Sequence, residues 1–209
     1  MVDRQLIGFR MQDVATRAGT MLQGTASGMI PMAIFTPVYS IWAAIAWPLF
    51  GSIFFTITLA ISVYFIVSAV RSFKLSRQLP DSRNADDLRI SKVMPVLSNI
   101  MGVGILVTVL VLVVINAYQW IVPSVMIIVA LHFFPMARLF RRTIDYTLGA
   151  LMLAGAALGF FLLAQDTAWQ VAWGSAGVIG AVVTISYGFN AIMSAGQVLS
   201  DYRRQAAWA

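Results

Sequence analysis

The sequence predicts an all-α membrane protein, a polytopic bundle of six transmembrane helices preceded by an N-terminal amphipathic surface helix. Of its 209 residues, 60% are hydrophobic and only 11% are charged, against roughly 25% charged residues in soluble domains. The apolar residues form long continuous runs, which excludes the alternating ten-residue segments typical of a β-barrel. Basic residues follow every second run. Composition, run length and charge placement therefore indicate the same class of protein.

Residues 1–20 are too polar to span a bilayer or to form a secretory signal. At helical spacing, apolar residues such as Leu6 and Met11 fall on one side, and Arg10 and Arg17 fall on the other. This pattern predicts an interfacial helix over residues 1–20, with its arginines near the lipid headgroups. A cytoplasmic extension of the first span is an equally good interpretation.

Six apolar runs predict six spans, at about residues 28–47, 50–70, 93–117, 120–139, 144–164 and 169–198. Pro31 and Pro37 should bend the first span, because each removes a backbone hydrogen bond. Only short turns separate the first span from the second, the third from the fourth and the fifth from the sixth, so three hairpins follow one another. The polar stretch 78–87 is a loop, and residues 1–209 form a single membrane domain.

The basic residues predict the orientation of the spans. All fourteen Lys and Arg residues lie in the N-terminal segment, in the loops after the second and fourth spans, or in the C-terminal tail. Because basic flanks stay on the cytoplasmic side, both termini should be cytoplasmic. Five aromatic residues should then mark the opposite interface: Trp47, Tyr118, Trp120, Trp169 and Trp173. Topology and anionic lipid explain the net charge of +6, so nucleic acid is not an expected partner.

Several kinds of chemistry are excluded by composition. The chain has no cysteine and a single histidine, His132, which rules out disulfides, thiolate catalysis and multi-histidine metal sites. It contains no phosphate-binding glycine loop, no zinc-protease helix and no serine nucleophile turn. We therefore predict no cofactor, no bound metal and no catalytic residue.

A group of polar residues recurs at similar depth, in the half of the bilayer nearest the basic loops. Polar groups facing lipid cost several kcal/mol each, so these side chains should turn toward one another or toward water. The arrangement predicts a polar pocket that opens to the cytoplasm. Its candidate ligand-binding residues are His132, Asn99, Asp145, Tyr187, Asn190 and Arg138.

Two of these residues have open alternatives. His132 could exchange protons near neutral pH with Asp145 as partner, or it could be a neutral residue that hydrogen-bonds between helices. Asp145 shares a helical face with Gly149 and should point inward. It could form an ion pair with a neighbouring arginine, Arg141 or Arg142, or with Arg71, or it could bind a substrate or a proton.

Small residues on the last two spans are suited to close helix packing. They could pack within one chain or between two, and a homodimer is the predicted assembly. The residues concerned are Gly155, Gly159, Gly174, Gly177, Gly180 and Ala181.

The segment from His132 through Pro135 and Ala137 to Phe140, followed by Asp145-Tyr146, resembles a His-Phe-x-Pro-x-Ala segment in small bacterial integral membrane proteins of unknown function. The resemblance covers about 20 of 209 residues. It implies no activity. Together with the charge asymmetry, it implies a location in the bacterial inner (cytoplasmic) membrane.

Three function classes remain. The inner polar pocket and bent helices favour binding or transport of a small molecule. The small size and missing catalytic motif would suit a structural or assembly subunit that contacts another membrane subunit as well as lipid. A membrane-embedded enzyme would need His132 and Asp145 to act as a pair, so we lean away from enzymatic activity.

Overall fold

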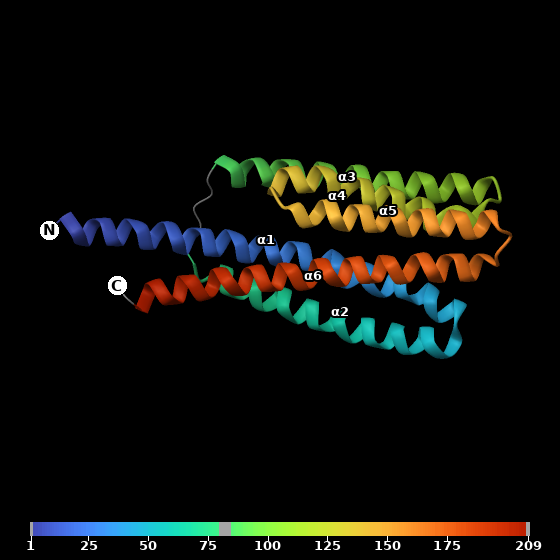
Figure 1. Cartoon of the computed structure of the whole chain (residues 1–209). Helices are drawn as coiled ribbons and strands as arrows, with labels where there is room; N and C mark the ends of the chain where they lie inside the picture. The colour runs from blue at the N-terminus through green and yellow to red at the C-terminus, as the bar shows by residue number, and fades with distance from the viewer. Residues whose placement is uncertain (1, 80–84, 208–209) are drawn as a thin grey trace. The chain divides into compact units, whose positions relative to one another are not determined.

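The computed structural model describes residues 2–79 and 85–207, which form six long α-helices and one short 3₁₀ turn (Figure 1). Side chains are described from Ala15 onward, apart from Arg17, Ser91 and residues 85–87 and 205–207. The helices are α1 (Val2–Ala46), α2 (Pro48–Ser76), α3 (Ala85–Val114), α4 (Ile121–Phe140), α5 (Thr143–Ala164) and α6 (Trp169–Ala207), and the 3₁₀ turn is Tyr118–Trp120.

Each of the six helices is long and apolar enough to cross a membrane, which confirms the predicted all-helical membrane protein. Every predicted span overlaps one of them. The third span was predicted to reach residue 117 but α3 ends at Val114, because Asn116 takes a left-handed conformation with φ of 55°. The Ala117 N–H then donates to the Leu112 carbonyl at 2.8 Å, and this bond closes the helix end.

The surface helix predicted over residues 1–20 is not a separate element. α1 runs without a break from Val2 through Pro31 and Pro37 to Ala46. Residues 1–30 contain no proline, and a glycine inside a helix costs only about 1 kcal/mol, so nothing there ends the helix. The continuous helix agrees with the alternative interpretation, an extension of the first span. The amphipathic face stays a prediction, since most of its side chains lie outside the described part.

The chain forms two compact units. The first contains Met1–Ile34, Ile61–Arg89 and Ser186–Ala209, and the second contains Phe35–Ala60 and Ile90–Ile185. Helices α1, α2 and α6 therefore contribute residues to both units, whereas α4 and α5 lie wholly in the second.

In the first unit, parts of α1, α2 and α6 pack around an aromatic residue of α2. Phe65 is fully buried, and a β-carbon on Gly188 of α6 would collide with its ring. Phe189 packs edge-on against Phe65, with 5.4 Å between the ring centroids. Met29 of α1 is also fully buried, in a cluster with Ala26, Ala69 and Ala191.

In the second unit, α1 and α6 approach through glycines of α6. A β-carbon on Gly177 would collide with the Tyr39 carbonyl oxygen, and one on Gly180 would lie 2.8 Å from the Tyr39 ring. Gly174 faces Ala46 in the same way, where a β-carbon would lie 2.5 Å away. The glycine face of α6 therefore packs within this chain, so these residues no longer argue for a homodimer.

Helices α4 and α5 also approach each other closely through glycines. A β-carbon on Gly159 would lie 2.8 Å from Pro123, and one on Gly149 would lie 3.1 Å from the Phe133 β-carbon. Gly155, between them, faces Met126 of α4 and Ile179 of α6. The small-residue face predicted for α5 is therefore buried inside the second unit.

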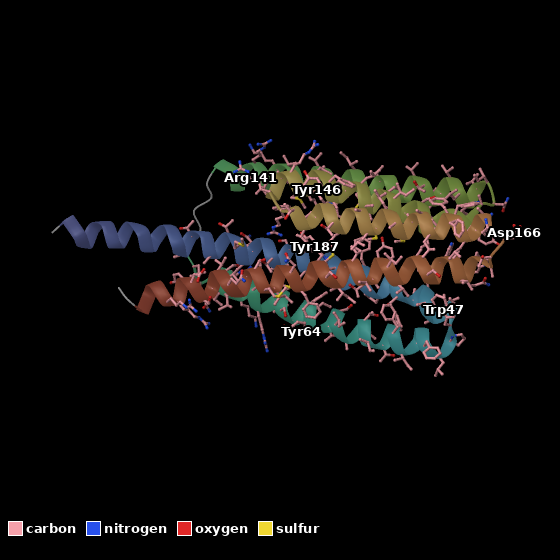
Figure 2. All side chains as sticks on the ribbon, in the orientation of Figure 1. Trp47, Tyr64, Arg141, Tyr146, Asp166 and Tyr187 are labelled. Carbon is pink, nitrogen blue, oxygen red and sulfur yellow. The ribbon has the colours of Figure 1, made fainter. Side chains whose placement is uncertain are left out.

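Aromatic residues gather at one end of the second unit. The Trp173 indole N–H donates to the Gln119 carbonyl at 2.7 Å, and its ring lies edge-on to Trp42, with 4.5 Å between centroids. Trp169 also packs against Trp173, with 4.8 Å between the ring centroids. Figure 2 shows Trp47 and Asp166 at this same end and Arg141 at the opposite end. The aromatic residues predicted for one interface do lie together, at the end away from the turn that contains Arg141.

Gly177→Ala tests the contact between α1 and α6. The added methyl group meets the Tyr39 carbonyl oxygen, which is backbone and can move only with α1. We expect the free energy of unfolding to fall by about 1–3 kcal/mol, measured by thermal unfolding in detergent. Gly102→Ala is the matched control, because nothing lies within 4 Å of the new methyl group. The packing is refuted if both variants unfold at the same temperature.

Candidate functional site

Asp145 is the most unusual polar residue of the second unit. It lies in the first turn of α5, just after the reversal at Arg141 and Arg142, and its side chain is 0% exposed. Arg141 takes a left-handed conformation with φ of 53°, which ends α4 and turns the chain into α5. The prediction that Asp145 points inward on the face of Gly149 is confirmed.

Both carboxylate oxygens of Asp145 are buried, and neither accepts a hydrogen bond from the residues that the structure describes. The ion pair predicted with an arginine therefore forms no hydrogen bond among the described residues, although the positive charge of Arg142 still acts on the carboxylate through space. Burying an ionised carboxylate without a partner costs several kcal/mol. Asp145 is thus a group that needs a cation or a proton.

His132 lies on α4 and is half-buried. Its neighbour Phe133 packs against Gly149, which lies one helical turn, or about 6 Å, beyond Asp145 along α5. His132 donates no hydrogen bond to Asp145, since both oxygens of that carboxylate are without a donor in the described structure. The acid–base pair that the enzyme alternative required is therefore not assembled.

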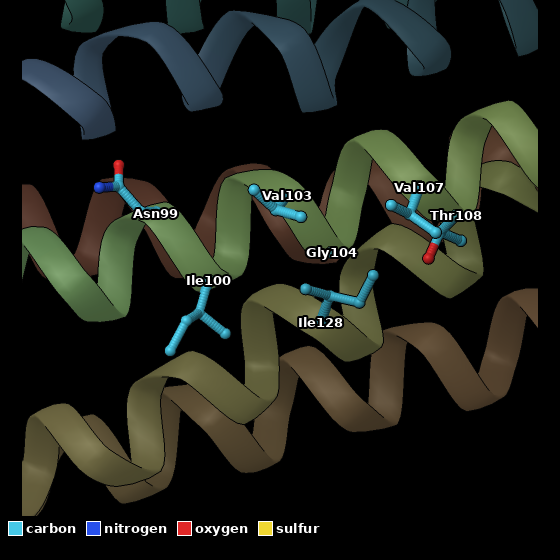
Figure 3. Close-up of a pocket in the computed structure, with 7 residues that line it drawn as sticks. All are labelled: Asn99, Ile100, Val103, Gly104, Val107, Thr108 and Ile128. Carbon is cyan, nitrogen blue, oxygen red and sulfur yellow. The ribbon is translucent and has the colours of Figure 1, made fainter.

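Asn99 and Arg138 also belong to the second unit, and both are exposed. Arg138 lies in the last turn of α4, where its positive charge favours the carbonyl end of the helix dipole. Asn99 lines a groove of about 660 Å³ between α3 and α4 (Figure 3). The other lining residues are apolar except for one hydroxyl: Ile100, Val103, Gly104, Val107, Thr108 and Ile128.

Tyr187 and Asn190 belong to the first unit, on α6. Tyr187 is buried, and its Cε1 atom would lie 3.7 Å from a β-carbon on Gly28 of α1. Asn190, one turn further along α6, is half-buried. Four of the six candidate residues thus lie in the second unit and two in the first. Their convergence on one cavity stays a prediction.

Buried hydroxyl groups in the second unit were not among the candidates. Thr36 of α1 donates to Thr184 of α6 at 2.9 Å, and Ser40 of α1 lies 2.6 Å from the Thr58 hydroxyl of α2. The spacing of Thr36 and Ser40, one helical turn apart within an apolar run, could have indicated a shared buried face. The hydroxyl of Tyr39, between them, is buried and has no hydrogen-bond partner among the described residues.

Among the described residues, no three metal-ligating side chains come close enough to hold a metal ion, and Asp145 belongs to no such group.

Comparison with protein-family models, with curated proteins and with solved structures found no match. The resemblance of the segment His132–Phe140 to bacterial membrane proteins of unknown function stays a prediction. Function is therefore inferred from the geometry of the helices and the environment of their polar side chains.

Proposed function

We propose that this membrane protein binds and translocates a small positively charged solute, a proton or another small cation, with Asp145 as the central binding group. The observation that carries the proposal is the burial of both Asp145 oxygens without a hydrogen-bond donor among the described residues. A carboxylate in that position is stabilised when a cation or a proton neutralises it. Intramembrane carboxylates of this kind are typical of ion and proton pathways.

The wider pocket belongs to the same proposal. Within the second unit, we place His132, Asn99 and Arg138 with Asp145 around a cavity that opens to the cytoplasm of a bacterial inner membrane; Tyr187 and Asn190, which belong to the first unit, stay predicted ligand-binding residues of that unit. These residues lie at similar distances from the predicted cytoplasmic ends of their spans, and leaving their polar groups against lipid would be costly; both points support this placement. The basic residues at the end of α4 support the cytoplasmic orientation.

Asp145→Asn tests the proposal, because it removes the charge while keeping the shape. The protein is reconstituted in liposomes that contain a pH-sensitive dye, and a potassium gradient with valinomycin sets the membrane potential. We expect potential-driven proton entry with the wild type and a loss of at least about 10-fold with Asp145→Asn, the size of effect that an essential charged group produces. The unfolding temperature should not fall, since a neutral amide removes a buried charge.

Asp166→Asn is the matched control. It makes the same chemical change at an exposed position in the turn between α5 and α6, and asparagine tolerates the left-handed conformation of Asp166, φ 55°. It should leave proton entry unchanged. Native mass spectrometry of the gently extracted protein provides the second readout, a retained small cation. Absence of both proton entry and a retained cation in the wild type would refute the proposal.

His132→Gln distinguishes the two roles left open for His132. If His132 exchanges protons with the pathway, the variant keeps its unfolding temperature but loses the pH dependence of proton entry near neutral pH. If His132 is an interhelical tie, the unfolding temperature falls and the pH dependence is unchanged.

A second function, assembly within a larger membrane complex, is favoured by α3. No described residue between Leu88 and Val114 is buried. Asn99 is exposed and lies seven residues beyond Lys92, about 10 Å further along the helix and within the apolar run. A polar group facing lipid is costly, and an amide is both donor and acceptor, so a neighbouring helix could satisfy it.

Asn99→Leu tests assembly. If α3 contacts another subunit or a second copy, crosslinking in the native membrane should yield a defined larger species that is weakened in this variant. Thr56→Val is the control, since Thr56 is an exposed hydroxyl on α2 that bonds its own helix at the Ser52 carbonyl, 2.8 Å away. A wild type that remains monomeric under crosslinking would rule out this function.

A further inference from the structure

A second cavity lies in the first unit, separate from Asp145. It has a volume of about 180 Å³ and is lined by residues of α1, α2 and α6. This volume is below the roughly 300–1,000 Å³ of typical small-molecule sites. The cavity therefore suits one compact chemical group at the end of a larger molecule.

The α2 wall of this cavity is polar. Ser68, Arg71, Ser72 and Leu75 line it, and their spacing of three, one and three residues puts them on one face of the helix. A guanidinium group and two hydroxyl groups thus lie within one helical turn of each other. Together they offer hydrogen-bond donors and one full positive charge, which is the chemistry that recognises phosphate.

The α6 wall is apolar and recessed. Ile192, Ala195, Gly196 and Leu199 line it with the same spacing, so the two helices present matching faces. A β-carbon on Gly196 would have nothing within 4 Å, which shows that the missing side chain leaves space there. Leu22 of α1 completes the apolar lining.

The position of the cavity indicates what enters it. Arg71 and Lys74 lie in the last two turns of α2, where the apolar run ends. This is the depth at which lipid phosphates meet a transmembrane helix. Arg71 and Lys74 are both exposed, but only Arg71 lines the cavity. The cavity thus combines one basic group at its edge with an apolar wall formed by α6.

We propose that this cavity binds the phosphate of an anionic phospholipid. Arg71 pairs with the phosphate oxygens, and Ser68 and Ser72 donate hydrogen bonds to them. The apolar α6 wall contacts the first acyl carbons, while the remainder of the lipid stays in the bilayer. The site is independent of Asp145 and of the function proposed for it.

Native mass spectrometry of the full chain in detergent tests this site. After titration with phosphatidylglycerol, we expect a first lipid adduct that is retained at least about 10-fold more strongly than phosphatidylcholine, because the choline cation of the latter neutralises its phosphate and is repelled by Arg71. Arg71→Gln should remove that preference. Lys74→Gln is the matched control, three residues away on the same helix, and it should keep the preference.

Gly196→Leu is the second variant, because it fills the cavity without changing any charge. We expect it to lose the phosphatidylglycerol preference while keeping a single unfolding transition and a monodisperse elution profile. Inorganic phosphate at millimolar concentration should compete only weakly, since it lacks the acyl carbons that contact α6. Full competition by phosphate would show that the site takes free phosphate and would overturn the lipid assignment. Equal losses with Arg71→Gln and Lys74→Gln, or an undiminished preference with Gly196→Leu, would overturn the site itself.

Discussion

Close contact between the backbones of α1 and α6 is the interaction on which the second unit depends. Lipid is as apolar as leucine, so membrane helices gain little from burying apolar side chains against each other and depend on van der Waals contact and a few hydrogen bonds. Gly177 and Gly180 let Tyr39 approach α6 where any side chain would collide. That approach also brings Thr36 within hydrogen-bond distance of Thr184.

The same constraint explains why Asp145 stands out. The buried Thr and Ser hydroxyls of the second unit bond to a neighbouring helix or to their own backbone, as Thr184 does with the Ala181 carbonyl at 2.9 Å, whereas the Tyr39 hydroxyl has no partner among the described residues. A hydroxyl can meet its needs locally, whereas an ionised carboxylate needs several donors or a cation. Asp145 has none of these donors among the described residues, although the fold buries it completely. A ligand can therefore supply the positive charge or the proton that the fold does not provide to the Asp145 carboxylate.

The exposed face of α3 and the cavity beside Arg71 differ in chemistry. The face of α3 that lines the groove is apolar apart from the Asn99 amide and the Thr108 hydroxyl, and it offers shape and two hydrogen-bonding groups to another helix. The cavity beside Arg71 offers a positive charge and two hydroxyls next to an apolar wall. Charge near the headgroups attracts anionic lipid, whereas an amide deeper in the bilayer favours protein contact.

The sequence by itself determined the number and approximate positions of the helices, because an apolar run of twenty residues has few alternatives in a membrane. It also predicted the inward direction of Asp145, since helical spacing places it on the face of Gly149 and Gly159. The sequence was compatible with either a separate surface helix or an extension of the first span at residues 1–20, and only the structure showed that α1 is continuous from Val2 to Ala46. Only the tertiary structure showed that the α6 glycines pack inside the chain and that Asp145 has no donor, because both depend on which helix lies opposite. Periodicity identifies the face that a helix buries, but the neighbour that covers this face is set by contacts between residues far apart in the chain.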